Sequence, residues 1–303
     1  MNTFFTDTTE RGWLRVSGDD ASTFLQGQLS NDLRKLTLQT AQLSSYSSAK
    51  GRMLAVLFLV RRGDDILIEM PRSILDATLS RLKMFVLRAR LTIEKADDID
   101  ALAIFGNDAP AMMSRYALPV PEVPLQCIDD PRGLRVVRRL GSVTRYSVIG
   151  PRERIAALRT TLDDTLRNDE GSHWRRADIE SGIPVVLPET RDHFVAQMAN
   201  LDLFGGISFD KGCYTGQEII ARLHYLGTLK RRLFIARIEG DAPVPGSAVH
   251  QAGESQAVGE IVDALADADG SIATVVLQLA ACDAELIVDS STAPLRIVSG
   301  PSA

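Results

Sequence analysis

The chain has 303 residues and a net charge of −5, with 45% hydrophobic and 24% charged residues. This composition is that of an ordinary globular protein and excludes a disordered chain. The negative charge argues against a protein that coats nucleic acid through a general basic surface. The longest apolar run, Met53 to Val60, is too short to span a membrane, and the N-terminus lacks a signal-peptide pattern.

The three cysteines, Cys127, Cys213 and Cys282, lie far apart in the sequence and are odd in number. Their spacing suits neither a disulfide framework nor a metal cage, and the four histidines show no ligand spacing either. We therefore expect no metal site and a location in the reducing cytoplasm, without membrane contact.

In chain order, the first half alternates strands and helices. Trp13 to Ser17 is predicted as a strand, and residues 21–33 carry apolar side chains on one helical face. Met53 to Val60 and Ile66 to Met70 flank a Gly-Asp turn, which predicts a hairpin. Residues 72–89 have helical periodicity with a basic outer side.

The pattern continues to about residue 170. A strand is expected at 91–94, and a third alternation follows: strand 101–106, helix 109–117, strands 135–139 and 145–150, and helix 151–162. After residue 229 the segments are short, alternating and separated by Gly, Pro, Asp and Ser, which predicts a small all-β barrel or sandwich.

Three basic runs stand out against the negative net charge. They are Arg81, Lys83, Arg88 and Arg90; four arginines within 132–139; and Lys230-Arg231-Arg232. Charge runs usually form solvated faces, and no aromatic residues are interleaved with these. Direct nucleic-acid binding is therefore not favoured.

Four glycines occur between Asp202 and Glu218, in DLFGGISFDKGCYTGQE. Such density permits left-handed turns or a close approach of backbone to a ligand. Cys213 lies about one turn before a predicted helix that starts at Gln217, and two residues from Lys211. Both features stabilise a thiolate, the reactive form of cysteine. Cys213 is thus a candidate reactive thiol, with a buried structural cysteine as the alternative. A Walker A loop is excluded, because no GK[ST] follows the glycines.

The only two tryptophans, Trp13 and Trp174, form a second group of candidates. An indole ring can stack on a flat heteroaromatic ligand, or it can simply fill a core. Glu180, in ADIESGIPVV, precedes a Gly-x-Pro turn. Its carboxylate could accept paired N–H donors from a pterin-like ring, or it could cap a neighbouring element.

KGCYTGQE, Lys211 to Glu218, resembles the signature of the YgfZ family of folate-binding proteins linked to tRNA modification. Three further segments also resemble blocks of that family: GWLRVSGDDASTFLQGQLSNDL, HWRRADIESGIPVV and FVAQMANLDLFGGISFDKG. The resemblance covers about 10–35 and 170–230, and the β-rich tail is in register.

This resemblance implies a relative of the glycine-cleavage aminomethyltransferase. It predicts an α+β, three-lobed architecture with a ferredoxin-like lobe. A folate-binding α+β body would occupy 1–228, its second lobe roughly 50–165, and a C-terminal β-barrel 229–303. Trp13, Trp174 and Glu180 would bind tetrahydrofolate or a derivative, and Cys213 with Lys211 would supply the chemistry.

The function that the resemblance implies is a folate-binding accessory protein. It would support iron–sulfur enzymes, a tRNA-methylthiolating enzyme among them, so that folate and iron–sulfur proteins are its expected partners. The alternative is a free-standing tetrahydrofolate-dependent one-carbon transferase, for which Asp32 in LSNDL is an acid in a block similar to that of the aminomethyltransferases. A structural scaffold with a vestigial folate cleft is disfavoured by the activated-looking Cys213. Whether the protein is an enzyme stays open at this point.

Overall fold

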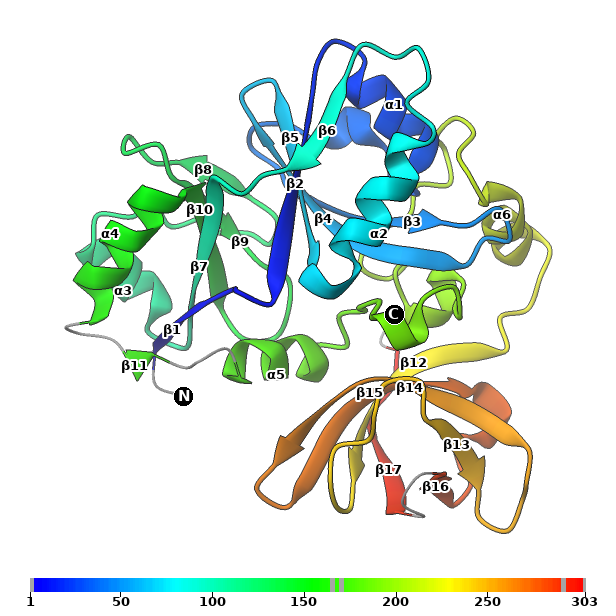
Figure 1. Cartoon of the computed structure of the whole chain (residues 1–303). Coiled ribbons are helices and arrows are strands. Elements are labelled where there is room, and N and C mark those ends of the chain that lie inside the picture. Colours follow the sequence, from blue (N-terminus) through cyan, green and yellow to red (C-terminus); the bar gives the residue numbers. More distant parts are fainter. Residues whose placement is uncertain (1–2, 164–166, 169–171, 290–292, 302–303) are drawn as a thin grey trace. The chain divides into compact units, whose positions relative to one another are not determined.

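The computed structural model describes residues 3–163, 167–168, 172–289 and 293–301 (Figure 1). The chain divides into two compact units, and each is assembled from separate segments. The first unit comprises Met1–Leu25, Leu33–Gln42 and Leu57–Ala177. The second comprises Gln26–Asp32, Leu43–Val56 and Asp178–Ala303.

A six-stranded sheet in the first unit has the order β11-β1-β7-β10-β9-β8. Neighbouring strands run antiparallel except β1 and β11, which are parallel. The strands are β1 (Phe4–Asp7), β7 (Ile99–Phe105), β8 (Cys127–Asp129), β9 (Arg135–Arg138), β10 (Arg145–Pro151) and β11 (Arg167–Asn168).

Helices α3 (Ala109–Arg115) and α4 (Arg152–Asp163) pack against this sheet. Helix α4 buries Ile155, Leu158 and Leu162, which share one helical face because they are three and seven positions apart. These side chains join the apolar residues of β7 and β10 in one core.

A five-stranded sheet has the order β3-β4-β5-β2-β6, and the unit boundary falls inside β4. Its strands are β2 (Arg11–Ser17), β3 (Gln42–Ser47), β4 (Met53–Arg62), β5 (Asp65–Pro71) and β6 (Thr92–Lys95). The predicted hairpin is confirmed: β4 and β5 pair antiparallel up to Arg62 opposite Asp65, with Gly63 at φ 60° in the turn.

Helix α2 (Arg72–Lys83) is shorter than predicted, since the pattern suggested 72–89. Leu82 is the last core position of the helix, whereas Met84 and Leu87 are 63% and 88% exposed. Leu87 also has φ 46°, which is incompatible with a continuing helix. The apolar residues after Lys83 continue the helical periodicity of the sequence, but Met84, Phe85 and Leu87 are exposed and do not pack in a core. Helix α1 (Ala21–Gln28) is likewise shorter than the predicted 21–33.

The C-terminal part of the second unit is a closed barrel in the order β12-β15-β14-β13-β16-β17. Its strands are β12 (Arg231–Ile238), β13 (Ala248–Gln251), β14 (Ala257–Asp267), β15 (Gly270–Gln278), β16 (Leu286–Val288) and β17 (Ala293–Ser299). Alternate residues such as Ala273, Val275 and Leu277 enter a common apolar core. The predicted α+β class with a C-terminal barrel is confirmed.

The remaining elements of the described residues are short. They are helices α5 (Ser172–Glu180) and α6 (Gln217–Tyr225) and the 3₁₀ turns η1 (Leu33–Lys35), η2 (Pro188–Thr190), η3 (Ala196–Ala199) and η4 (Leu279–Ala281). No helix within these residues has both the length and the apolar character needed to cross a bilayer.

Candidate functional site

The signature KGCYTGQE forms a loop in the second unit that leads into α6. Its lysine, Lys211, is buried, and its ammonium donates hydrogen bonds to the carbonyl oxygens of Gln26 at 2.6 Å, Leu29 at 2.6 Å and Asn31 at 2.9 Å. An ammonium group has three N–H donors, and three carbonyls accept here. The lysine therefore fastens the signature loop to the segment at the end of α1.

The partners of Lys211 bear on the role expected of it beside Cys213. Proximity in sequence suggested that Lys211 acts on Cys213, yet the Lys211 ammonium donates to backbone carbonyls. Lys211 is thus placed to position the loop.

Cys213 is exposed, whereas Cys127 is buried and Cys282 is half-buried. Burial raises the pKa of the Cys127 thiol to about 11 and also raises the pKa of Cys282. A thiolate is the nucleophilic form of cysteine. Of the three thiols, that of Cys213 is the most accessible.

The residues after Cys213 hold the loop against α6. Tyr214 is buried with its ring 4.8 Å from the Lys211 ammonium, and burial raises the pKa of its hydroxyl to about 12. The backbone N–H of Gln217 donates to the Tyr214 carbonyl at 3.2 Å. Gly216 has φ 83°, and a side chain there would meet the Ser48 carbonyl oxygen at 2.5 Å. Only glycine fits this position.

A buried polar network surrounds the segment that Lys211 holds. Asn31 donates from its side-chain amide to the carbonyls of Leu43 and Gly205, both at 2.7 Å. Ser30 donates to the Gly206 carbonyl at 2.7 Å. Asp32 is buried and accepts a hydrogen bond from the Gln26 side chain at 3.0 Å. Asp32 was the one residue of this network predicted from the sequence; the polar run SND between two apolar leucines was the available signal for its neighbours.

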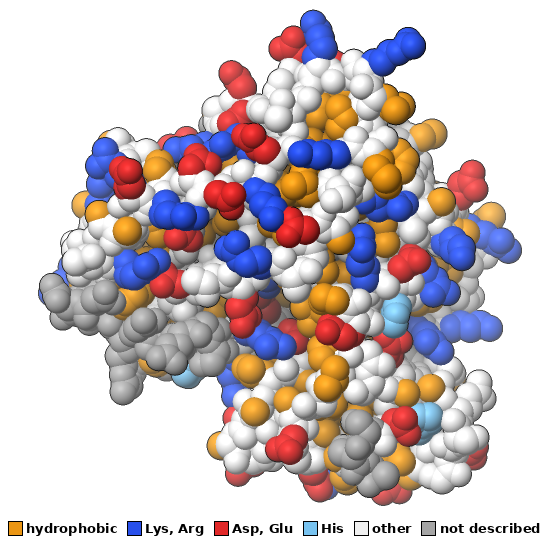
Figure 2. Space-filling model, viewed as in Figure 1, with side chains coloured by type: hydrophobic (Ala, Val, Ile, Leu, Met, Phe, Trp, Pro, Cys, Tyr) orange, Lys and Arg blue, Asp and Glu red, His pale blue; other side chains and the backbone are white. Residues whose placement is uncertain are grey.

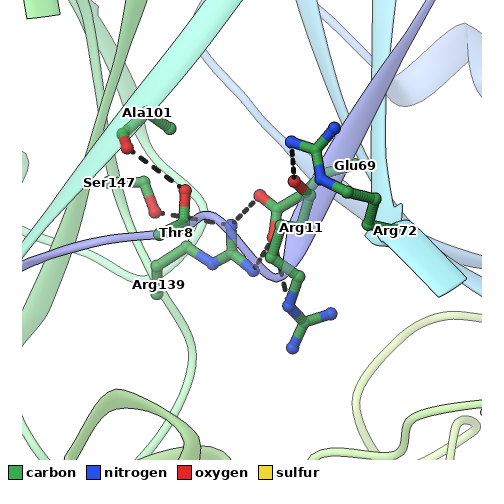
Figure 3. Close-up of polar contacts among 7 residues, drawn as sticks. All are labelled: Thr8, Arg11, Glu69, Arg72, Ala101, Arg139 and Ser147. Atoms are coloured by element: carbon green, nitrogen blue, oxygen red, sulfur yellow. Dashed lines mark hydrogen bonds and ion pairs between the residues drawn. The ribbon is translucent and has the colours of Figure 1, made fainter. Parts of the chain in front are cut away.

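The first unit holds a second polar cluster, which was not predicted from the sequence (Figure 3). Glu69 is 4% exposed, and its carboxylate accepts hydrogen bonds from the Arg139 guanidinium at 2.7 and 3.4 Å. The Arg11 guanidinium lies 3.8 Å from the same carboxylate. A lone carboxylate inside the apolar strand Ile66 to Met70 was the signal that pointed to this buried pair.

Aromatic rings border this ion pair. Trp13 and Phe58 lie opposite Glu69 on its two neighbouring strands, so the three side chains share one face of the sheet. The Arg139 guanidinium lies over the Phe58 ring at 3.7 Å and 5.9 Å from the Trp174 ring. Both predicted tryptophans thus border one ion pair.

Trp174 has a further cation against its ring, since the Arg145 guanidinium lies 4.8 Å from its centroid. Both Trp13 and Trp174 are only 5% exposed. The indole N–H of Trp174 is buried and has no hydrogen-bond partner among the described residues. A buried donor without a partner is unfavourable by about 1–3 kcal/mol, so this atom is suited to an acceptor from a ligand.

Glu180, the third predicted ligand, is the last residue of α5 and is half-buried. It lies six residues after Trp174, which places the two about 120° apart around the helix axis and about 9 Å apart along it. The helix therefore does not present them on a common face.

The basic run at 132–139 is not the solvated face that its composition suggested. The Arg135 side chain is 2% exposed and donates two hydrogen bonds to Asp129. Arg139 is 10% exposed and pairs with Glu69. The interpretation as a solvated run is wrong for these two residues, because each has a carboxylate partner that the local sequence pattern could not indicate.

No group of three His, Cys, Asp or Glu side chains within the described part of the chain is arranged to hold a metal ion.

Comparison with known proteins defines the class first. No family model matches the chain. The crystal structure of the glycine cleavage system aminomethyltransferase T from Bartonella henselae matches with a TM-score of 0.74 at 15% identity, over 98% of this chain and 85% of that one. The protein therefore has the fold of aminomethyltransferase T, as expected.

Sequence relatives then give the family. The tRNA-modifying protein YgfZ of Colwellia psychrerythraea is 31% identical over 300 residues, which cover 98% of this chain and 89% of that protein. The same-named protein of Serratia proteamaculans is 32% identical over 271 residues, covering 85% and 78%. The chain belongs to the YgfZ family of tRNA-modifying proteins, and the predicted family is confirmed.

Proposed function

We propose that this protein is a folate-binding accessory factor of the cytoplasm that supports iron–sulfur enzymes and thereby tRNA methylthiolation. The observation that carries the proposal is the construction of the signature loop. Lys211 is buried to hold the loop on three carbonyls, while Cys213 beside it stays exposed. A loop fixed in this way can present a thiol to another molecule. Because the chain belongs to a family of tRNA-modifying proteins, we propose that this molecule is a partner in tRNA modification.

Tetrahydrofolate or a derivative is the proposed cofactor, and Trp13, Trp174 and Glu180 are its proposed ligands. The Trp174 side chain fits such a group, since its indole N–H lacks an acceptor among the described residues. The Arg145 guanidinium, which lies against the Trp174 ring, could bind an electron-rich heterocycle or the carboxylates of a folate tail. When bound, a reduced folate supplies a carrier for one-carbon units. The fold shared with aminomethyltransferase T is compatible with this choice.

Cys213 is the proposed reactive thiol, and Lys211 its positioning residue. An iron–sulfur cluster bound by thiolates usually requires four, and the chain contains three cysteines in total. We therefore propose that any cluster chemistry takes place in a partner iron–sulfur protein and that Cys213 acts toward that partner.

A free-standing folate-dependent one-carbon transferase is the alternative. The observation in its favour is Asp32, a buried carboxylate that Gln26 holds at 3.0 Å beside the Lys211 anchor. The two functions differ in turnover: a transferase consumes a small amine or methyl substrate in the presence of tetrahydrofolate, and an accessory factor does not.

The cofactor is tested by calorimetric titration of tetrahydrofolate into wild type, Trp174→Phe and Trp13→Phe. Phenylalanine keeps an apolar ring and removes the indole N–H. We expect wild type to bind and Trp174→Phe to bind at least tenfold more weakly. If Trp174→Phe binds as tightly as wild type, Trp174 is not a ligand; if wild type does not bind, the protein is not folate-dependent.

The thiol is tested in cells that lack the native protein, with methylthiolated tRNA as the readout. We expect Cys213→Ala to fold normally and to fail to restore the modification. Cys127→Ala and Cys282→Ala are matched controls and should restore it. Full restoration by Cys213→Ala would reduce this cysteine to a structural residue.

A further inference from the structure

Helix α6, directly after the signature, leaves most of its side chains uncovered. Ile220 is the one buried residue of this helix, Gln217–Tyr225. Tyr225, its last residue, is 62% exposed, and Leu226 beyond it is 86% exposed. A helix in a globular protein usually buries a continuous apolar face. The exposed face of α6 therefore suits a binding partner.

The aromatic rings at the end of α6 are arranged as a group. Phe209 stacks on His224 with ring centroids 3.6 Å apart and an angle of 11° between the planes. Tyr225 lies edge-on to His224 at 4.6 Å. The Tyr225 ring is thus held in place while much of its surface faces solvent.

Cations flank these rings. Arg222 lies one turn before Tyr225 on α6, and Lys230 follows shortly after the helix; both are exposed. The turn between β3 and β4 adds Lys50 and Arg52. This turn packs against α6, because a side chain at Gly51 would meet Ile219 at 2.7 Å.

These cations are largely unneutralised. Glu218 is four residues from Arg222, the spacing of a helical ion pair, but no ion pair joins them within the described residues. Neither Lys50 nor Lys230 has an ion-pair partner in that part of the chain. Glu218 is the acid nearest in sequence to Tyr225. Asp192 lies against the turn between β3 and β4, where its carboxylate accepts a hydrogen bond from Ser48 at 2.7 Å and its backbone carbonyl accepts one from Arg52 at 3.3 Å. In Figure 2, Lys and Arg side chains gather at the edge where Figure 1 shows α6.

We propose that this surface, consisting of Phe209, Arg222, His224, Tyr225, Lys230 and the turn with Lys50 and Arg52, binds single-stranded RNA. Exposed aromatic rings stack on bases and adjacent cations contact phosphates, which is the composition of single-strand binding surfaces. Aromatic residues and arginine are also enriched at protein–protein interfaces, but lysine is depleted there, and Lys50 and Lys230 supply half of the cations of this surface, so RNA is the favoured partner. The inference rests on the proposed role in tRNA modification and names RNA as a direct partner, which the sequence alone did not favour.

The test is fluorescence anisotropy with a labelled RNA hairpin that has a single-stranded loop, and with a fully paired RNA of the same length. We expect the hairpin to bind more tightly than the duplex. Tyr225→Ala should weaken hairpin binding about tenfold, because stacking on one base is lost. Arg222→Ala with Lys230→Ala should weaken it and lower the salt slope by about 1.4, or 0.7 for each lost phosphate contact. Lys83→Ala, an exposed cation of α2 in the first unit, is the matched control and should bind normally.

Several outcomes would overturn the inference. They are no hairpin binding by wild type, unchanged binding by Tyr225→Ala, or equal binding of duplex and hairpin. Two results would assign the surface to a protein instead. One is self-association of the chain that Tyr225→Ala abolishes. The other is binding to an iron–sulfur enzyme that depends on Tyr225 while RNA binding does not. Tetrahydrofolate titration of the same variants separates the two proposals: folate binding that persists while RNA binding is absent refutes only the RNA surface.

Discussion

Lys211 in the second unit and Arg139 in the first are both cations held inside the protein, but their partners differ. Arg139 pairs with the carboxylate of Glu69 and stacks on Phe58, so it joins side chains. Lys211 donates to three backbone carbonyls, so it joins two stretches of chain. A cation bound to a carboxylate stabilises one contact, whereas a cation bound to carbonyls fixes the conformation of a loop. The second arrangement is suited to presenting Cys213.

The largest expected effect tests the carbonyl-bound cation. Lys211→Met keeps the apolar stem and removes the ammonium, which leaves the carbonyls of Gln26, Leu29 and Asn31 without this donor. Each buried carbonyl that loses its partner costs about 1–3 kcal/mol, so for three carbonyls we expect the free energy of unfolding in urea to fall by about 3–9 kcal/mol. Lys230→Met, at an exposed lysine, should change little. Equal stability of both variants would show that Lys211 does not anchor the loop.

A smaller loss tests the carboxylate-bound cation. Glu69→Gln removes the charge partner of the buried Arg139 but keeps an oxygen that can accept one hydrogen bond. We expect a loss of about 2–3 kcal/mol in the same measurement, because a buried guanidinium is left without its counterion. Glu239→Gln disrupts the pair with Arg296, which is 79% exposed, and should have no measurable effect. If both variants lose the same free energy of unfolding, the buried pair contributes no more to stability than the exposed pair.

The pH dependence of stability sharpens the comparison in the first unit. The Cys127 pKa is about 11 when folded, against an ordinary value of 9.0. Below pH 9 the Cys127 thiol is protonated in both the folded and the unfolded chain, so its contribution to the free energy of unfolding is fully present. Between pH 9 and 11 only the unfolded chain loses the proton, and stability should fall by up to about 1.4 kcal/mol per pH unit. The difference between wild type and Cys127→Ala isolates this slope, and Cys282→Ala is the control. A slope that is the same in Cys127→Ala would contradict the assignment.

The smallest effect on stability belongs to Cys213. Its side chain is exposed, so Cys213→Ala should change the free energy of unfolding by no more than about 0.5 kcal/mol. In the folded wild type, iodoacetamide should label Cys213 fastest and Cys127 slowest, as mass spectrometry of peptides would show. Slow labelling of Cys213 would mean that the loop does not present its thiol.

Elements with a local signal were predicted well. The hairpin of β4 and β5, helix α4 and the β-rich tail each combine regular hydrophobic periodicity with clear turn residues. Strand β3, QLSSYS, was missed because its serines give no strand pattern. Ser44 and Ser45 are buried there through hydrogen bonds to Ser30 and Asn31, which are distant in sequence.

The candidate site shows the same limit. The family signature identified Cys213. The partners of Lys211 could not be predicted in the same way, because they lie far earlier in the chain: Leu29, for example, is separated from Lys211 by 182 residues. Arg139 looked like part of a surface run because Glu69 is 70 residues away. A buried charge is defined by its partner, and periodicity carries no information about a partner so distant.

The strand orders also bear on how the protein behaves at high concentration. A free sheet edge carries unpaired backbone groups that can recruit another chain, and the length of the edge strand limits such pairing. The barrel is closed and has no edge. Among the described strands, the open sheets end in β11 of 2 residues, β8 of 3, β6 of 4, and β3, whose 6 residues are all buried. The described part of the fold thus offers no long, exposed edge strand on which aggregation by edge pairing could begin.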